Sequence, residues 1–286
     1  MKKKLHIAVQ KSGRLHDESL KLLNDCGISI DNGKDQLKAI ARNFPLEIFY
    51  LRNGDIPQYL RDGVVDIAII GENLLVEKGD DISIKEKLGF SKCRVSIAIP
   101  KEDTYKGIET LTGKKIATSY PNTVKGFLAE KGIEAELHII NGSVEIAPNI
   151  GLSDAVCDIV SSGSTLFKNN LKEVEVLFKS EAVLAASSTL DAEKNDILKK
   201  LQFRIQSVLK GRQSKYILMN VPNESIDKIS SILPVLKSPT VLPLAEPGWS
   251  SLHSVVNEGT FWEVIDELKA AGAQDILVCP VEKMVL

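Results

Sequence analysis

Several features that announce a function in other proteins are missing from this sequence of 286 residues. No apolar run approaches the roughly 20 residues that a membrane-spanning helix needs. The first residues, Met1-Lys2-Lys3-Lys4, lead into a strand-like segment and not into the apolar stretch of a signal peptide. We therefore expect a cytoplasmic protein without a membrane anchor. The net charge of −2 provides no basic field, so nucleic acid is not an expected partner.

Motifs for metal binding and for covalent catalysis are missing as well. The four cysteines form no CxxC pair, and the four histidines show no HxxxH spacing. A transition-metal site built by the protein is therefore not expected, and any metal should arrive with a substrate. No serine stands in a GxSxG motif. The absence of GxxxxGK[ST] and of GxGxxG after the first strand argues against a Walker-type ATPase and a Rossmann dehydrogenase.

What is present is the composition of a globular protein, with 43% hydrophobic and 26% charged residues. Its length suits two or three domains. From residue 5 to about residue 180, short apolar runs alternate with amphipathic stretches, which predicts an α/β fold. The expected strands are Leu5–Val9, Leu46–Leu51, Asp66–Ile70, Arg94–Ile99, Lys115–Thr118, Glu136–Ile140, Asp158–Ser161 and Val174–Phe178, and the expected helices include Asp17–Cys26, Ile56–Asp62 and Thr123–Lys131.

One nine-residue pattern occurs twice. Residues 66–74 and residues 158–166 both fit D-I-x-x-x-G-x-x-L. Each copy predicts a buried strand, a glycine turn and the start of a helix. Chance can produce such a match, but two similar lobes that face one cleft would also produce it. Open α/β sheets bind ligands beyond the carboxyl ends of their strands, where both glycine turns would lie.

The sequence changes character near residue 190. A lysine-rich helical pattern covers Leu190–Gly211, and a compact unit with its own rhythm follows. Its expected elements are a strand (Tyr216–Val221), a helix (Ser225–Leu233), two strands (Thr240–Leu242 and Leu252–Val256), a helix (Phe261–Ala271) and a strand (Ile276–Pro280). This βαββαβ order is that of a ferredoxin-like domain, a type that commonly binds an effector.

The strongest local signal is Ser161-Ser162-Gly163-Ser164-Thr165, between an expected strand and an expected helix. Free N–H groups and the dipole of a helix N-terminus attract anions, glycine permits close approach, and four hydroxyls add donors. This Ser/Gly loop suits a phosphate group. The alternative is an ordinary Ser/Thr cap after a tight turn.

A second signal is Gln10-Lys11-Ser12-Gly13-Arg14 after the first strand, named the basic loop below. Lysine and arginine on a glycine turn can clamp a polyphosphate, although a solvated basic loop has the same composition. Leu51–Pro57 reads as the structural start of a helix. Two phosphate-ready loops without a nucleophile favour a reaction that depends on positioning and electrostatics.

At these positions the sequence resembles the ATP phosphoribosyltransferase family over its full length. The family's pattern around its phosphoribosyl-pyrophosphate loop is matched by Glu145, Gly151, Ser153, Val156, Asp158, Ile159, Ser162, Gly163, Thr165 and Leu166. Further matches are Gln10–Leu15, Asp55–Pro57, Gly71–Asn73, Val144–Pro148 and Ser214–Tyr216, and in the C-terminal part Ser238–Thr240, Leu242–Leu244, Phe261-Trp262 and Pro280–Met284. Ser162 and Ser164 stand where relatives can carry threonine and alanine, and neither change removes a backbone donor.

The resemblance implies a fold and a reaction. The fold is a catalytic body with two lobes like those of type II periplasmic binding proteins, followed by an ACT-like regulatory domain. The implied boundaries are residues 1–90 with 178–212 for the first lobe, 91–177 for the second, and 213–286 for the regulatory domain. In the implied reaction, N1 of ATP attacks C1 of phosphoribosyl pyrophosphate and displaces pyrophosphate, with Mg²⁺ as cofactor. Histidine is the implied allosteric inhibitor, and a homohexamer with a dimer as active unit is the implied assembly.

The resemblance also implies residue roles. Asp158 and the Ser/Gly loop (Ser161, Ser162, Gly163, Ser164, Thr165) would bind phosphoribosyl pyrophosphate. Gln10, Lys11, Gly13, Arg14, Gly71, Glu72 and Asn73 would bind ATP, with Lys11, Arg14, Glu145 and Asp158 as the catalytic set. Glu145 would face the ribose hydroxyls or Mg²⁺, or else be a capping or surface carboxylate. Asn220, Leu236, Ser238 and Thr240 would bind histidine. A solute receptor of the same fold and a different phosphoribosyltransferase are the alternatives.

Overall fold

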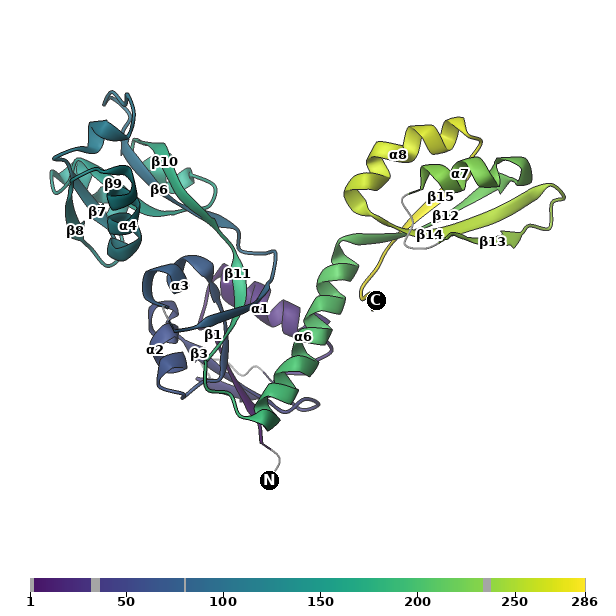
Figure 1. Ribbon diagram of the computed structural model, residues 1–286, viewed down its shortest axis with the longest axis horizontal. Helices are drawn as coiled ribbons and strands as arrows, with labels where there is room; N and C mark the ends of the chain where they lie inside the picture. Colours follow the sequence, from purple (N-terminus) through teal and green to yellow (C-terminus); the bar gives the residue numbers. More distant parts are fainter. Residues whose placement is uncertain (1–2, 32–36, 80, 234–237, 286) are drawn as a thin grey trace. The chain divides into compact units, whose positions relative to one another are not determined.

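The computed structural model describes residues 3–31, 37–79, 81–233 and 238–285. The chain forms two compact units, one of residues 1–24 and 28–198 and one of residues 25–27 and 199–286. The division therefore falls inside helix α6 (Ala192–Arg212). The larger unit contains two β-sheets and the smaller unit a third, and Figure 1 labels most of their strands.

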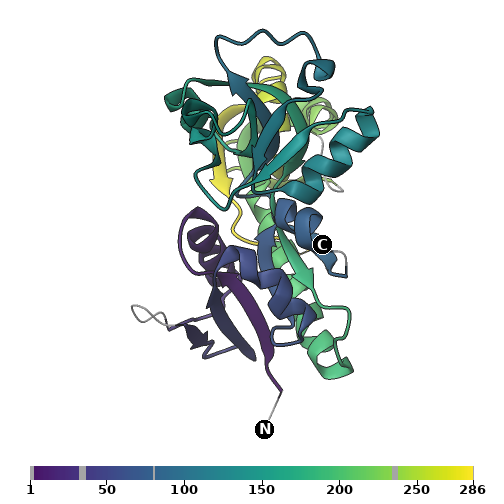
Figure 2. The same cartoon turned by 90° about the vertical axis from the view of Figure 1, so that its left-hand side faces the viewer.

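The first sheet of the larger unit has six strands in the order β2-β3-β1-β4-β11-β5. With its helices it forms the first lobe, which Figure 2 shows with α1 in purple and α2 and α3 in blue. Strands β3, β1 and β4 are parallel, so their carboxyl ends share one edge of the sheet. The elements are β1 (Leu5–Gln10), α1 (Arg14–Asp25), β2 (Lys38–Ile40), β3 (Leu46–Leu51), η1 (Asn53–Asp55), α2 (Ile56–Arg61), β4 (Ile67–Gly71), α3 (Glu72–Lys78), β5 (Ser83–Lys87) and β11 (Ala182–Ala186).

The second sheet has five strands in the order β10-β6-β9-β7-β8 and forms the second lobe. Its elements are β6 (Cys93–Pro100), η2 (Ile108–Leu111), β7 (Lys115–Thr118), α4 (Pro121–Lys131), β8 (Glu136–Ile139), η3 (Val144–Ile146), η4 (Pro148–Ile150), β9 (Ala155–Val160), α5 (Ser164–Lys168) and β10 (Leu171–Ser180). The chain enters this lobe at β6 and leaves it at β10. These two strands pair antiparallel, with Cys93 opposite Ser180, and run side by side in Figure 1. The crossing between the lobes is therefore a two-stranded hinge.

The smaller unit confirms the expected βαββαβ order. Its elements after α6 are β12 (Ser214–Pro222), η5 (Asn223–Ser225), α7 (Ile226–Ile232), β13 (Thr240–Pro243), β14 (Trp249–Asn257), α8 (Glu258–Ala270) and β15 (Gln274–Pro280). The sheet is antiparallel in the order β13-β14-β12-β15, the ferredoxin-like arrangement. One face of the sheet packs on α7 and α8 through a core of Ile217, Met219, Val221, Ile229, Leu233, Leu252, Val256, Phe261 and Leu268.

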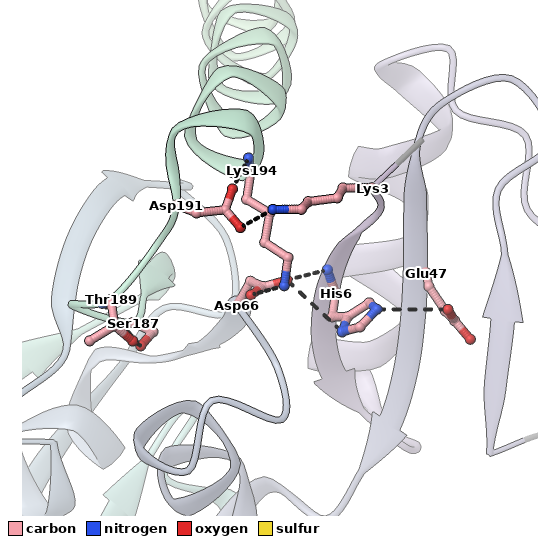
Figure 3. A network of polar contacts seen from close by, with 8 residues as sticks. All are labelled: Lys3, His6, Glu47, Asp66, Ser187, Thr189, Asp191 and Lys194. Carbon is pink, nitrogen blue, oxygen red and sulfur yellow. Dashed lines mark hydrogen bonds and ion pairs between the residues drawn. The ribbon is translucent and has the colours of Figure 1, made fainter. Parts of the chain in front are cut away.

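A polar network fastens the start of α6 to the first sheet (Figure 3). Asp66, only 6% exposed, accepts hydrogen bonds from the backbone N–H of His6 (2.8 Å) and from Nζ of Lys194 (2.7 Å). Asp191 caps the helix by accepting from the N–H of Lys194 and pairs with Lys3 at 2.9 Å. A buried carboxylate is tolerated here because a cation and a backbone donor compensate it.

The expected elements are present, with shifts that matter for function. Strand β9 was expected over Asp158–Ser161 but spans Ala155–Val160, so Ser161 begins the loop. Three strands were not expected: β2, β5 and β11. Strands β2 and β5 lie at the sheet edges, and β11 is rich in alanine, which has low β propensity. No described helix has the length and apolar character to cross a membrane.

Candidate active site

The Ser/Gly loop lies between β9 and α5, as expected. Gly163 is the cap residue of α5 and has φ of +79°, a left-handed conformation that side chains with a Cβ rarely adopt. An added Cβ would meet only Cγ1 of Val160, at 4.0 Å, so conformation and not space requires glycine here. Ser162 accepts a hydrogen bond from the N–H of Ser164 (3.4 Å), which holds the turn in shape.

A cavity of about 230 Å³ opens over this loop. Its lining consists of Glu145, Val156 and the continuous segment Asp158–Leu166. The structure thus places Glu145 and Asp158 in the same cavity as the loop. The pocket is polar at the loop and at both carboxylates, which suits a sugar phosphate with several hydroxyls.

Asp158 is the second carboxylate of this cavity. It is half-buried in β9, and none of the ion pairs among the described residues includes it. Burial raises the pKa of Asp158 above its usual range, the N–H of Ile159 counteracts this, and the nearby Glu145 raises it further. A carboxylate with these surroundings gains from a ligand that brings hydroxyl donors or a cation.

The structure brings the basic loop of the first lobe to the Ser/Gly loop of the second. Nη1 of Arg14 donates to Oγ of Ser161 at 3.2 Å, and Nη2 donates to the carbonyl of Lys92 at 3.5 Å. Nε of Arg14 also pairs with Glu18 at 3.4 Å. Two loops 147 positions apart in the sequence therefore meet at one site.

The remaining residues of the basic loop have different surroundings. Nε2 of Gln10 donates to the carbonyl of Ser12 (2.8 Å), so this side chain shapes the turn that contains Gly13. The N–H of Lys11 donates to the carbonyl of Leu51, while its side chain is exposed. Lys11 can therefore reach a ligand without breaking a fold contact.

The segment Gly71–Asn73 makes its contacts with other parts of the protein. Asn73 is 3% exposed, donates from Nδ2 to the hydroxyl of Tyr120 (3.0 Å) and accepts from Oγ of Ser180 (3.0 Å). An added Cβ on Gly71 would lie 2.4 Å from Oδ1 of Asn73, so the glycine makes room for that side chain. Glu72 pairs with Lys87 at 3.2 Å. These contacts are with protein groups, and an ATP contact of the three residues stays a prediction.

Two residues at the site were not expected from the sequence. Arg94 donates from Nη1 to the carbonyl of Ser161 (3.2 Å) and pairs with Glu173 at 2.5 Å. It therefore supports the Ser/Gly loop from the adjacent strand β6, where it lies opposite Val160 at the end of β9. Tyr120 is 8% exposed, and the pKa of its hydroxyl is raised by burial and then by the charge of Asp158. The available signal was its position: Tyr120 comes two residues after the end of the parallel strand β7 and precedes Pro121.

In the smaller unit, the residues predicted to bind histidine lie on the sheet and beside it. The pairing register places Asn220 opposite Ser251 and Thr240 opposite His253, on the face that does not pack on the helices. Ser238 is exposed just before β13. Leu236 lies outside the described residues.

Among the described residues, no three histidine, cysteine, aspartate or glutamate side chains are grouped so that they could hold a metal ion by themselves. The donors that the cavity offers are the oxygens of Glu145 and Asp158. Two neighbouring carboxylates, of which Glu145 raises the pKa of Asp158, fit a hard divalent cation, which a phosphorylated substrate would complete.

Matches to known proteins cover almost the whole chain. The family model described as ATP phosphoribosyltransferase matches residues 52–207, and the model of that family's C-terminal domain matches residues 211–283. An ATP phosphoribosyltransferase of Cytophaga hutchinsonii is 56% identical over 281 residues, 98% of each chain. One of Parabacteroides distasonis is 52% identical over 99% of this chain and all of its own.

A solved structure of the same family agrees with these matches. The ATP phosphoribosyl transferase (HisG:HisZ) complex from Thermotoga maritima has a TM-score of 0.60 at 29% identity, over 71% of this chain and 98% of its own. A substrate-binding protein of an amino-acid ABC transporter has a TM-score of 0.47 at 14% identity.

The fold, the loop and these matches define a pentosyltransferase with a two-lobed catalytic body and a C-terminal domain. The chain belongs to the ATP phosphoribosyltransferase family, which transfers the phosphoribosyl group of phosphoribosyl pyrophosphate to ATP in the first step of histidine biosynthesis. The expectation from sequence is confirmed at this level.

Proposed function

We propose that the transfer takes place where the basic loop meets the Ser/Gly loop. The observation that carries this proposal is the 3.2 Å contact between Arg14 and Ser161 beside the cavity over the loop. A reaction between two substrates needs both reacting atoms at one place, and this is where the two predicted binding loops converge.

On the phosphoribosyl side, the 5′-phosphate binds the Ser/Gly loop: Ser161, Ser162, Gly163, Ser164 and Thr165. Backbone N–H groups at the start of α5 and four hydroxyls supply its donors. Asp158 and Glu145 accept hydrogen bonds from the ribose hydroxyls or share the cation that the pyrophosphate group brings. We assign that cation as Mg²⁺, because the donors are hard oxygens and the ligand is a diphosphate. When bound, it neutralises the leaving pyrophosphate.

On the nucleotide side, Lys11 and Arg14 bind phosphates of ATP or of the departing pyrophosphate. Both cations lie on a loop whose shape Gln10 and Gly13 hold. Gly71, Glu72 and Asn73 line the nucleotide side from the neighbouring strand end, through β4 and α3. This edge collects the carboxyl ends of β1, β3 and β4, the usual ligand side of such a sheet.

In the reaction, the lone pair of adenine N1 forms a bond to C1 of the ribose while the bond from C1 to the pyrophosphate oxygen breaks. Both electrons of that bond leave with pyrophosphate. No protein nucleophile is needed. Arg14 and Lys11 stabilise the charge that develops on the leaving group, and Asp158 and the Ser/Gly loop hold the sugar in line.

The test is release of pyrophosphate from phosphoribosyl pyrophosphate and Mg²⁺ with ATP, compared with GTP, adenine and orotate. Of these four acceptors, we expect only ATP to cause the release of pyrophosphate. The matched pair Lys11→Ala and Lys21→Ala, each removing one lysine of the first lobe, should separate the basic loop from the general charge. Equal activity of both variants would remove Lys11 from the site, and release with orotate and not ATP would overturn the substrate assignment.

We also propose that the smaller unit binds histidine through Asn220, Leu236, Ser238 and Thr240 and inhibits the reaction. Thr240 on β13 and Asn220 on β12 lie on the open face of the sheet, on either side of β14, where a free amino acid can bind. Thr240→Ala should keep the uninhibited rate but need several-fold more histidine, within the range of about 1–3 kcal/mol of coupling usual for allostery. Ser231→Ala, an exposed serine on α7, is the control. An unchanged inhibition curve for Thr240→Ala, or indifference of the wild type to millimolar histidine, would contradict this assignment.

The remaining proposals concern organisation. We keep residues 1–90 with 178–212 as the first catalytic lobe, 91–177 as the second and 213–286 as the ACT-like regulatory domain. We propose a cytoplasmic homohexamer built from dimers. Sedimentation at micromolar protein, with and without histidine, tests this assembly.

A further inference from the structure

Helix α4 of the second lobe has no cap of its own. Its cap position is occupied by Tyr120, whose side chain makes no capping hydrogen bond. Serine, threonine, aspartate or asparagine usually stands there, because the first N–H groups of a helix have no partner inside it. A tyrosine at this position means that the donors of α4 must be satisfied from elsewhere.

The partner comes from the first lobe. Glu77, near the end of α3, accepts from the N–H of Asn122 (3.0 Å) and from both the N–H (2.9 Å) and the hydroxyl (2.8 Å) of Thr123. Its backbone carbonyl accepts from Nδ2 of Asn122 at 3.0 Å. Glu77 is only 4% exposed. One carboxylate thus takes three donors at the start of a helix in the other lobe.

The hydrogen bonds of the first turn of α4 are complete only with this carboxylate. Pro121 occupies the first helical position and has no N–H. The N–H groups of Asn122 and Thr123 go to Glu77, and the N–H of Val124 goes to the carbonyl of Tyr120 at 3.0 Å. A buried carboxylate is costly unless it is compensated, and a helix N-terminus compensates it through charge-assisted hydrogen bonds and the dipole. Separating α3 from α4 would leave both the carboxylate of Glu77 and the first N–H groups of α4 without these partners.

The position of this contact links it to the site. Residues 119–120 follow β7, which pairs in parallel with β9, with Thr118 opposite Cys157. The start of α4 therefore lies beside the strand end that carries Asp158. On the other lobe, Asn73 is the second residue of α3, and its N–H donates to Oγ of Ser180 at the hinge (2.9 Å). Helix α3 thus holds the hinge at one end and the second lobe, through Glu77, at the other.

We propose that Glu77 is a positioning residue: it caps α4 across the two lobes and keeps the Ser/Gly loop in register with the basic loop. Glu77 contacts neither of the loops that we assign to the substrates. It acts through α4, because losing the cap leaves two N–H groups without partners and frees the lobes to shift. A misplacement of about 1 Å can cost roughly 10²-fold in rate when two substrates must be aligned.

The experiment compares Glu77→Ala, Glu77→Gln, Thr123→Val and the double variant Glu77→Ala/Thr123→Val. Rates are measured at least 20 °C below each melting temperature, so that the folded fraction is equal. We expect kcat of Glu77→Ala to fall about 10- to 100-fold with both KM values nearly unchanged, as an effect on alignment requires. Glu77→Gln keeps one acceptor and should recover part of the rate. The double variant should match Glu77→Ala, because the hydroxyl contact that Thr123→Val removes is already lost without the carboxylate.

The control is Asn257→Ala, which removes the cap of α8 in the smaller unit, where Asn257 accepts from the N–H of Gly259 at 3.0 Å. It should lower the melting temperature by a comparable amount and leave kcat within two-fold of the wild type. If Glu77→Ala behaves like Asn257→Ala, Glu77 is only a helix cap and the proposal is wrong. If Glu77→Ala does not fold, Thr123→Val decides: a several-fold loss of kcat supports the proposal, and an unchanged kcat overturns it.

Discussion

The two segments that share the pattern D-I-x-x-x-G-x-x-L, residues 66–74 and 158–166, differ in how their polar side chains are surrounded. In the first copy, Asp66 is buried and bound to Lys194, and Asn73 is buried and bound across the lobes. In the second, Asp158 is half-buried without an ion pair, and the segment around Gly163 is exposed at a cavity. Polar groups that are satisfied inside the protein stabilise the fold, while polar groups left open at a cavity are available to a ligand.

The two copies also occupy different positions along their strands. Asp66 directly precedes β4, and Gly71 is the last residue of that strand. Asp158 is the fourth residue of β9, and Gly163 comes three residues after the strand ends. Gly71 and Gly163 both occupy the cap position of the helix that follows, α3 or α5, so the predicted helix starts are equivalent. The prediction of equivalent strands was wrong, because β4 runs up to its glycine and β9 ends three residues before its own. A shift along the strand carries one aspartate to the amino end of its sheet and the other toward the ligand edge.

The largest expected difference is between the two aspartates. Asp158→Asn should lower kcat/KM by about 10²- to 10³-fold, the range for losing a charge that stabilises the transition state. Because the pKa of Asp158 is raised in the folded protein, its ionisation destabilises the fold as pH rises through that pKa. Asp158→Asn should therefore melt at the same or a higher temperature at pH 7, and any gain should vanish in acid, where the carboxyl is neutral in both states. A large loss of stability would show that Asp158 is structural.

Arg14→Ala tests whether a residue of the first lobe also belongs to the site rather than to the fold. We expect kcat/KM to fall by roughly 10²-fold, because a charged contact worth several kcal/mol is lost, while circular dichroism should stay almost unchanged. Arg42→Ala, which breaks the exposed pair of Arg42 with Asp31, is the control and should leave turnover unaffected. If Arg14→Ala stays within a few-fold of wild type, Arg14 is a solvated surface residue that only bridges the lobes.

Asp66→Asn should show the opposite effect. It leaves Lys194, whose side chain is 21% exposed, without its anion and should lower the free energy of unfolding by about 2 kcal/mol. The kcat of the folded fraction should not change, because Asp66 lies at the amino end of β4. Urea denaturation followed by fluorescence gives the stability. Adding Lys194→Met should restore part of it, and additive losses in the double variant would contradict the pairing.

The sequence predicted the site better where chemistry is local than where partners are distant. The Ser/Gly loop could be predicted because hydroxyls, a glycine and the surrounding strand and helix lie within a few residues. The contact of Arg14 with Ser161 joins positions 14 and 161, and no local pattern contains it. The roles of Tyr120 and Glu77 were missed for the same reason, since each depends on a group of the other lobe.

For the fold, long apolar strands were predicted and marginal ones were not. The βαββαβ order and the two-lobed α/β body followed from periodicity, and β3 and β7 were placed at their observed bounds. Strand β5 (Ser83–Lys87) is mostly polar, and its pairing with β11 at the sheet edge, not its own residues, makes it a strand.

The smallest expected effect concerns the two glycines of the second lobe, Gly163 in the loop and Gly126 inside α4. Gly163→Ala forces a Cβ into a left-handed conformation and should cost about 1 kcal/mol of stability. Gly126 has helical geometry with no atom within 4 Å of an added Cβ, so Gly126→Ala should gain about 0.5–1 kcal/mol. The larger side chain of Gly163→Val should also weaken phosphoribosyl pyrophosphate binding, because it projects into the space over the loop. Thermal melts and titration with phosphoribosyl pyrophosphate measure both effects. Wild-type affinity in folded Gly163→Val would mean that the phosphate does not approach this backbone. Gly163 and Gly126 would then differ only in their backbone conformation.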